Sequence, residues 1–314
     1  MNIKNNIERN KYLLVYFKGE YEENGEQVYF AISEDGLNWG NINGDKPVII
    51  STLGECGVRD PFIIRANDNN KFYIIATDLR IYGNGDWEKA QNNGSQSIMI
   101  WESTDLINWS NQRKVKLSLD TAGCTWAPEV FFDESSNEYI IFWASRIPIA
   151  KGGKDNYQRV YYSRTKDFYN FSDPDVWIEL KDKDENVLSV IDSTVTKVDN
   201  IYYRFTKNES EKYIYLEKSY NLLGSWSKVN SPQLESIKNV EGPICYKIGS
   251  ENKWCLLIDN YGQGGYYPLI SSDLSIGEFE KIDKSKYKLP TGARHGSVIS
   301  ISDSEFKNLK RKYY

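Results

Sequence analysis

Four residues that can carry or share protons open short apolar segments far apart in the sequence. Asp60, Asp192 and Glu241 are carboxylic acids, and His295 is the only histidine of the chain. Two carboxyls, one protonated and one ionised, can perform general acid and base chemistry on a bond between them. Because His295 would have to be the base of every nucleophile–histidine mechanism, such mechanisms are disfavoured and carboxylate chemistry is the main expectation.

Each of these residues, taken by itself, also fits a structural role. Asp60 precedes a proline and Asp192 precedes Ser-Thr, and aspartate at such positions commonly caps a turn. Glu241 precedes Gly-Pro, which frees the backbone from regular strand pairing. A histidine before a glycine is often simply hydrogen-bonded. A functional role therefore requires elements that bring the four residues together.

An internal repeat indicates how these elements are arranged. Five segments begin with a small, acidic or imidazole residue and continue as an apolar strand, and their starts lie roughly 50 to 70 residues apart. The five starts are Asp60, Ala127, Asp192, Glu241 and His295. The first four are followed by an aromatic second strand, and several have a third strand that runs into a repeated polar tail.

The fifth repeat is incomplete at the C-terminal end of the chain. Its missing strands lie at the other end, in segments 12–17 and 28–33. This pattern predicts an all-β fold, a five-bladed β-propeller whose last blade is closed by both termini. We expect residues 1–314 to form a single propeller domain, because no linker rich in Pro, Gly and Ser interrupts the repeat. A short helix is expected near residues 304–310, and a β-sandwich with many hairpins is the alternative fold.

The first strand of each propeller blade lines the central axis, so the five starts should meet at one mouth of a central cavity. Carboxylates gathered in a concave site shift one another's pKa values, which favours a chemical role. Glu129 is left out of this set, because alternation along its strand directs its side chain elsewhere.

Composition and charge exclude several other classes of protein. Lys and Arg total 39 against 44 for Asp and Glu, a net charge of −5, and no basic cluster suits a phosphate backbone. The four cysteines lack the paired spacing of a zinc site and are expected to be reduced, buried thiols. No apolar run approaches the roughly 20 residues of a membrane-spanning helix. Neither nucleic acid nor membrane is expected as a partner. With no secretory signal visible, a cytoplasmic location is expected unless the chain has been trimmed.

Five short motifs surround the strand starts. They are Arg59-Asp60-Pro61, Trp126-Ala127-Pro128-Glu129, Ile191-Asp192-Ser193, Glu241-Gly242-Pro243 and Arg294-His295-Gly296-Ser297. With these motifs the chain resembles glycoside hydrolase family 43 over residues 12–301. The resemblance implies a five-bladed propeller that hydrolyses pentose-containing polysaccharides with inversion.

The resemblance also implies roles for individual residues. It implies Asp60 as the general base, Asp192 as the residue that orients the acid and tunes its pKa, and Glu241 as the general acid. In these roles we expect Asp60 to stay ionised with help from Arg59 or backbone donors, and Glu241 to stay protonated because Asp192 raises its pKa. It places His295 near the base of the pocket, where some relatives hold a water or a structural calcium ion. No cofactor is required for this chemistry.

Further substrate contacts are expected from aromatic and cationic residues near the mouth. Trp126 should either stack on a sugar face there or pack in the core. Arg204 is expected to hydrogen-bond a sugar hydroxyl or Asp192, or else to form an ordinary ion pair, and Arg59 is expected to contact substrate. The polar excursion 78–97 is long enough to wall off one side of the groove, which favours removal of single terminal sugars.

The expected substrates are oligosaccharides derived from xylan or arabinan, with β-D-xylose or α-L-arabinofuranose as the released sugar. Three alternatives remain open. They are an arabinanase-type endo- or exo-hydrolase, a non-catalytic propeller that binds glycans, and a retaining fructan hydrolase or transferase.

Overall fold

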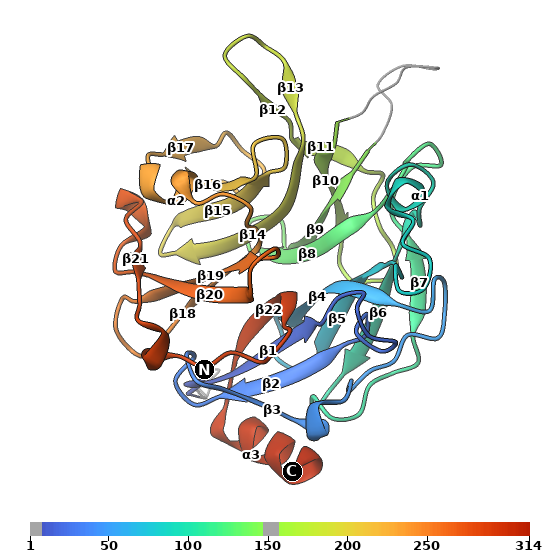
Figure 1. The fold of residues 1–314 in the computed structure, drawn as a ribbon, viewed down its shortest axis with the longest axis vertical. Helices are drawn as coiled ribbons and strands as arrows, with labels where there is room; N and C mark the ends of the chain where they lie inside the picture. Colours follow the sequence, from blue (N-terminus) through green and yellow to red (C-terminus); the bar gives the residue numbers. More distant parts are fainter. Residues whose placement is uncertain (1–7, 147–156) are drawn as a thin grey trace.

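The computed structural model describes residues 8–146 and 157–314, and most of the strands form five four-stranded antiparallel sheets (Figure 1). Blade 1 contains β4 (Val58–Arg65), β5 (Phe72–Asp78), β6 (Ser97–Ser103) and β7 (Arg113–Lys116). Blade 2 contains β8 (Trp126–Asp133), β9 (Glu138–Ser145), β10 (Arg159–Thr165) and β11 (Asp175–Ile178). Blade 3 contains β14 (Val190–Val198), β15 (Ile201–Asn208), β16 (Tyr213–Ser219) and β17 (Ser227–Val229). Blade 4 contains β18 (Glu241–Lys247), β19 (Trp254–Asn260), β20 (Gly265–Ser271) and β21 (Glu280–Lys281).

The fifth blade combines the two ends of the chain. Its strands, in sheet order, are β22 (Arg294–Ile301), β1 (Lys11–Phe17), β2 (Tyr29–Ser33) and β3 (Trp39–Asn41). Strand β1 pairs antiparallel with β22, so that Leu13 lies opposite Ile299. This pairing confirms the prediction that both termini close the last blade, and it leaves no open seam in the ring.

The first strands of the five blades line the centre of the molecule. They contact one another in ring order: β4 with β8, β8 with β14, β14 with β18, β18 with β22, and β22 with β4. The predicted five-bladed β-propeller is therefore confirmed. A small hairpin of β12 (Leu180–Lys181) and β13 (Val187–Leu188) extends outside the five sheets (Figure 1).

Helices are few and short in the described part of the chain. They are α1 (Trp87–Asn92), α2 (Pro232–Ser236), α3 (Asp303–Tyr313) and the 3-10 turns η1 (Asn43–Asp45), η2 (Leu274–Ile276) and η3 (Lys284–Lys286). Helix α3 extends past the expected residues 304–310 because a capping box of Ser302 and Glu305 starts it. Among the described residues, no helix has the length and apolar character needed to cross a bilayer.

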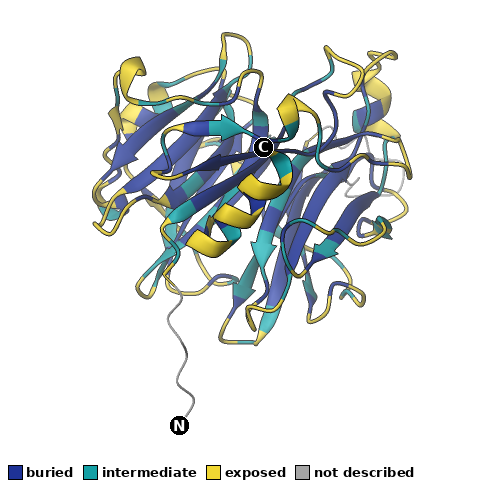
Figure 2. Cartoon of the chain, turned by 90° about the horizontal axis from the view of Figure 1, so that it is seen from below, coloured by how far each residue is buried: buried dark blue, intermediate teal, exposed yellow. Residues whose placement is uncertain are grey.

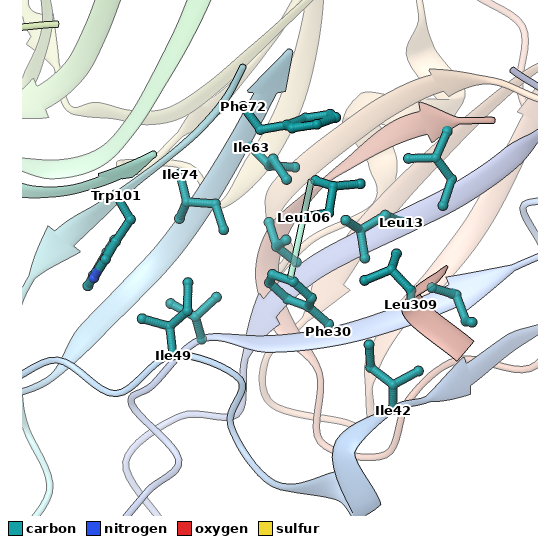
Figure 3. Close-up of a cluster of buried hydrophobic side chains, with 14 of the residues drawn as sticks. Leu13, Phe30, Ile42, Ile49, Ile63, Phe72, Ile74, Trp101, Leu106 and Leu309 are labelled. Atoms are coloured by element: carbon teal, nitrogen blue, oxygen red, sulfur yellow. The ribbon is translucent and has the colours of Figure 1, made fainter. Parts of the chain in front are cut away.

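The core lies between neighbouring sheets, where aromatic and β-branched residues of facing strands interdigitate. One cluster joins blade 5 to blade 1 and includes Leu13, Phe30, Ile63, Ile74 and Leu309 (Figure 3). Each such buried side chain contributes about 1.5–3 kcal/mol relative to exposure. Figure 2 shows the buried strands and the exposed outer side of α3. The sheets thus form a rigid frame that fixes where each inner strand ends.

All four cysteines are free thiols. Cys124 and Cys255 are buried and Cys245 is half-buried, but Cys56 is exposed, contrary to the expectation that all are buried. Cys56 lies in a tight turn before β4 with a φ of 54°, and this turn lies on the surface.

Candidate active site

The inner strands share a backbone irregularity at the same end. Asp60, Ala127, Asp192 and Gly242 have φ values of 50°, 48°, 47° and 52°, and the pairing of each strand with its neighbour shifts register at that point. Residues other than glycine seldom adopt a positive φ, and a bulge of this kind bends the strand and redirects a side chain. The repeated bulges therefore remove the simple alternation of side chains at the mouth of the propeller.

His295 lies at the centre of the group that results. Its Nδ1 atom is 3.5 Å from Oδ1 of Asp60 and 3.8 Å from Oδ1 of Asp192, and its Nε2 atom is 3.9 Å from Oε1 of Glu129. Burial alone would lower the pKa of His295, but these three carboxyls raise it well above its ordinary value. His295 is therefore an imidazolium at neutral pH, with one carboxyl from each of three inner strands around it.

Asp60 is held as a carboxylate. Its Oδ2 atom accepts a hydrogen bond of 2.8 Å from the hydroxyl of Thr77 on β5. Burial would raise the pKa of Asp60, but His295, Arg59 and Thr77 together lower it. The expected ionised state agrees with this result, although His295 contributes more to it than Arg59 does.

Asp192 lies between the histidine and the start of blade 4. Its Oδ2 atom accepts a hydrogen bond of 3.1 Å from the backbone N–H of Gly242. Burial raises the pKa of Asp192 to about 6; the His295 charge opposes this rise, and the Glu241 charge adds to it. Asp192 thus fixes the backbone next to Glu241 directly.

Glu241 is held by two cations. Nζ of Lys207 donates to its Oε2 atom at 2.8 Å, and a guanidinium N–H of Arg294 donates to its Oε1 atom at 2.8 Å. Burial would raise the pKa of Glu241, but the charges of Lys207 and Arg294 lower it. The expectation that Glu241 stays protonated near neutrality is therefore wrong for the free protein, because these two cations outweigh the carboxylate of Asp192.

The two cations are themselves anchored. Nε of Arg294 donates to Oδ2 of Asp259 at 2.6 Å, and Lys207 also contacts Glu209 at 2.7 Å. Sequence reasoning gave no role to Lys207 or Asp259. The available signal was a charged residue near the end of a second strand, Lys207 on β15 and Asp259 on β19.

Glu129 belongs to the group, contrary to the expectation. Its side chain is buried, contacts His295, and has a pKa raised to about 7 by burial. The bulge after Trp126 adds a residue to β8. The alternation of side chains counted from the start of the strand therefore assigns the Glu129 side chain to the wrong side.

Arg59 and Trp126 lie beside the mouth, and both contact Trp87 of helix α1. The Arg59 guanidinium donates to Glu20 at 3.0 Å and Glu26 at 2.9 Å and lies 4.9 Å from the ring of Trp87. Trp126 is half-buried and meets Trp87 edge to face, with ring centroids 6.3 Å apart. The excursion 78–97 is thus packed against the start of both blade 1 and blade 2, as a wall would be.

Arg204 does not join the site. It is buried between Trp177 and Trp226, at 4.6 Å and 4.2 Å from their ring centroids, and it donates to Glu217 on the neighbouring strand β16. The expected contact with Asp192 is corrected: Arg204 lies opposite Val195 in the β14–β15 pairing, several residues from the mouth. Of the two roles considered, the ordinary ion pair is the one present.

The residues around His295 do not resemble a calcium site. The described residues hold no group of three or more His, Cys, Asp or Glu side chains arranged to bind a metal. Calcium prefers oxygen ligands, and the imidazolium of His295 already supplies a positive charge among these carboxyls. The chemistry considered below uses no metal, and a structural calcium ion stays a prediction.

Comparison with known proteins agrees with this arrangement. A family model described as a probable glycosyl hydrolase domain, named as related to glycoside hydrolase family 43, matches residues 8–307. The chain is similar to an α-L-arabinofuranosidase of Bifidobacterium longum subsp. longum, with 31% identity over 369 residues and 95% of this chain covered. The match covers 34% of that relative, so the chain spans about a third of its length.

Two solved structures share the fold. An endo-1,4-β-xylanase from Bacteroides thetaiotaomicron has a TM-score of 0.59 at 13% identity, covering 88% of this chain and 91% of its own. An α-L-arabinanase from Cellvibrio cellulosa, complexed with arabinohexaose, has a TM-score of 0.59 at 11% identity. The match covers 90% of this chain and 96% of the arabinanase chain. Such low identities establish likeness of fold. Because the family model matches nearly the whole chain, this protein belongs to the glycoside hydrolases of the family 43 type.

Proposed function

We propose that the chain is an inverting glycosidase that releases a terminal pentose, β-D-xylose or α-L-arabinofuranose, from xylan- or arabinan-derived oligosaccharides. The observation that carries the proposal is the group of carboxyls from different inner strands around one buried imidazolium. Inversion needs one carboxylate that activates water and one carboxylic acid that protonates the leaving oxygen. The pentose is proposed from the similarity to an α-L-arabinofuranosidase.

Asp60 is the base in this proposal. Its pKa is lowered, so it is ionised over the neutral range and can take a proton from a water molecule. As that proton transfers, the water oxygen bonds to the anomeric carbon and the bond to the leaving oxygen breaks. The imidazolium of His295 stays protonated and keeps the carboxylate in place.

Glu241 is the acid, and it must gain a proton before it can act. In the free protein Lys207 and Arg294 hold it ionised. Lys207 has a second carboxylate partner in Glu209, at 2.7 Å, so it can leave Glu241 without losing its only counter-charge. A sugar that separates Glu241 from Lys207 removes the larger of the two cationic influences, so the pKa of Glu241 rises although Arg294 still opposes the effect of burial.

Asp192 positions the acid. Its hydrogen bond to the N–H of Gly242 fixes the backbone beside Glu241, and its raised pKa lets it share a proton near neutrality. This role agrees with the family resemblance and requires no contact between Asp192 and the sugar.

The proposal is tested with aryl glycosides of β-D-xylose and α-L-arabinofuranose. Glu241→Gln should slow turnover strongly with a poor leaving group and much less with dinitrophenolate, which leaves without a proton. Asp60→Asn should slow both by roughly 10²–10⁴-fold. Glu185→Gln, an exposed carboxyl of the β12–β13 turn, serves as the control.

Proton NMR of the first-formed sugar decides the stereochemistry. The inverted anomer is expected, and a retained anomer would contradict the single displacement. Product analysis on arabinan and xylan oligosaccharides separates the alternatives: single pentoses support the proposal, and longer products identify an arabinanase-type enzyme. Glycan binding without turnover on any of these substrates would identify a non-catalytic propeller.

A further inference from the structure

A second cavity lies beside the mouth of the propeller. It is a groove of about 550 Å³, which falls within the size range of small-molecule sites. One wall comes from blade 4, at residues 263–267, and the other from the segment 284–293 that leads into β22 (Figure 1). We call it the lysine groove, after Lys281, Lys284 and Lys288, which line it.

The lysine groove adjoins the candidate active site through two short connections. Ala293 lines the groove, and the next residue is Arg294, which holds Glu241. Tyr266 also lines it, and its hydroxyl donates to the carbonyl of Gly242 at 2.7 Å. A ligand in the groove therefore lies next to the backbone that positions the proposed acid.

The groove is basic in an acidic protein. Its lining holds three lysines and no aspartate or glutamate, although the chain has a net charge of −5. Within residues 8–146 and 157–314, none of the three lysines forms an ion pair, and Lys281 lies 4.8 Å from the ring of Tyr267. Two acids are adjacent to these lysines in sequence: Glu280 precedes Lys281, and Asp283 precedes Lys284 and accepts from the N–H of Ser285 as the cap of η3. The three ammonium groups are thus available to an anion.

The kinds of side chain that line the groove indicate the class of ligand. The lysines come from β21, from η3 and from the segment before β22, and the half-buried rings of Tyr267 and Tyr287 also line the groove. A compact phosphate is usually held by donors that converge on one point. Lysines from three elements together with tyrosine rings instead suit an acidic saccharide, whose carboxylate meets an ammonium and whose ring stacks on a tyrosine.

We propose that the lysine groove binds a uronic acid unit of a branched or acidic oligosaccharide whose neutral terminal sugar occupies the active site. This inference rests on the proposed glycosidase function for its substrate. The argument from charge depends only on the residues that line the groove.

The test measures binding by calorimetry, so it needs no turnover. Trigalacturonate is compared with neutral galactotriose, and tighter binding of the acidic trimer is expected. The double variant Lys284→Gln/Lys288→Gln should weaken trigalacturonate binding by about tenfold or more and leave galactotriose unchanged. Lys286→Gln is the matched control, because it removes the same charge from η3 at a position outside the groove.

Three results would overturn the proposal. They are equal affinity for the acidic and neutral trimers, an equal loss in the Lys286→Gln control, and displacement of trigalacturonate by millimolar inorganic phosphate at constant ionic strength. Activity on neutral aryl pentosides is measured separately with the double variant and should be unchanged. Acid-selective binding by a protein without hydrolysis would count against the glycosidase function and leave the groove assignment intact.

Discussion

At the scale of single residues, charge balance decides what each carboxyl can do. His295 is the only imidazole of the chain, and its positive charge lies among three acids. Asp60 and Glu241 have lowered pKa values, whereas Asp192 and Glu129 have raised ones, to about 6 and about 7. Asp192 and Glu129 are buried, whereas Asp60 and Glu241 are half-buried and have cations that outweigh the effect of burial on their pKa values.

Removal of the imidazolium should change the pH dependence of the base. In His295→Gln, Asp60 loses the cation that most strongly lowers its pKa, so its pKa rises. The acidic limb of the kcat/KM profile should therefore move to higher pH. An unchanged acidic limb in a folded variant would exclude Asp60 as the group that titrates there.

Removal of Lys207 should change the basic limb of the pH profile. In Lys207→Met, Glu241 keeps Arg294 but loses its other cation, and burial then raises its pKa. The basic limb of kcat/KM, where the acid loses its proton, should move to higher pH. Lys212→Met is the control, since Lys212 contacts Glu209 and not Glu241. A shift of equal size in both variants would argue against a direct effect of Lys207 on Glu241.

At the scale of elements, the bulges at the start of the inner strands carry the site. They place residues with positive φ at the mouth in four blades, and in blade 4 this residue is Gly242. A Cβ atom at Gly242 would lie 2.7 Å from Cγ and 2.8 Å from Cβ of His295. Only glycine fits there, because the backbone at this second residue of β18 passes directly against the imidazole.

Gly242→Ala should therefore impair both stability and catalysis. The positive φ alone costs about 1–2 kcal/mol for a residue with a Cβ, and the overlap with His295 displaces the imidazole. We expect a lower midpoint in urea and a reduced kcat. Gly262→Ala is the control, because a Cβ there meets no atom within 4 Å. Wild-type kcat in Gly242→Ala would show that the position of His295 is not critical.

At the scale of the whole molecule, closure of the ring depends on the pairing of β1 with β22 and on the helix that follows it. Helix α3 packs Leu309 (Figure 3) and Phe306 into the cluster shared by blades 5 and 1. Arg65 of β4 contacts Glu305 of α3 at 2.8 Å. The C-terminal helix thus joins the last blade to the first.

Leu309→Ala should destabilise the propeller by about 2–5 kcal/mol, because it leaves a cavity in a fully buried cluster. Equilibrium unfolding in urea measures the effect. Lys310→Ala, on the exposed side of the same helix, should change stability by less than about 0.5 kcal/mol. Equal effects of the two substitutions would show that α3 contributes little to ring closure.

The fold and much of the site could be predicted from the sequence because they depend on local patterns. The repeat of a polar start and an apolar strand identifies the blades, and the incomplete fifth repeat identifies the closure by both termini. The same repeat identifies Asp60, Asp192 and His295 as neighbours, since each opens an inner strand. The single-domain assignment of residues 1–314 and the cytoplasmic location stay predictions.

Only the tertiary structure decided the charge states of the carboxyls and whether Glu129 and Arg204 belong to the site. Lys207 and Arg294 reach Glu241 from a neighbouring blade and a neighbouring inner strand, and no local pattern shows that they outweigh Asp192. Glu129 enters the site because a bulge breaks the alternation of β8, and Arg204 leaves it because its partner lies on β16. Electrostatic energies depend on the spatial distances between charged groups that are far apart in the sequence. Strand formation depends on residues that are close together in the sequence. The sequence alone therefore determined the propeller and its mouth, and the packing of blades determined which carboxyl there holds a proton.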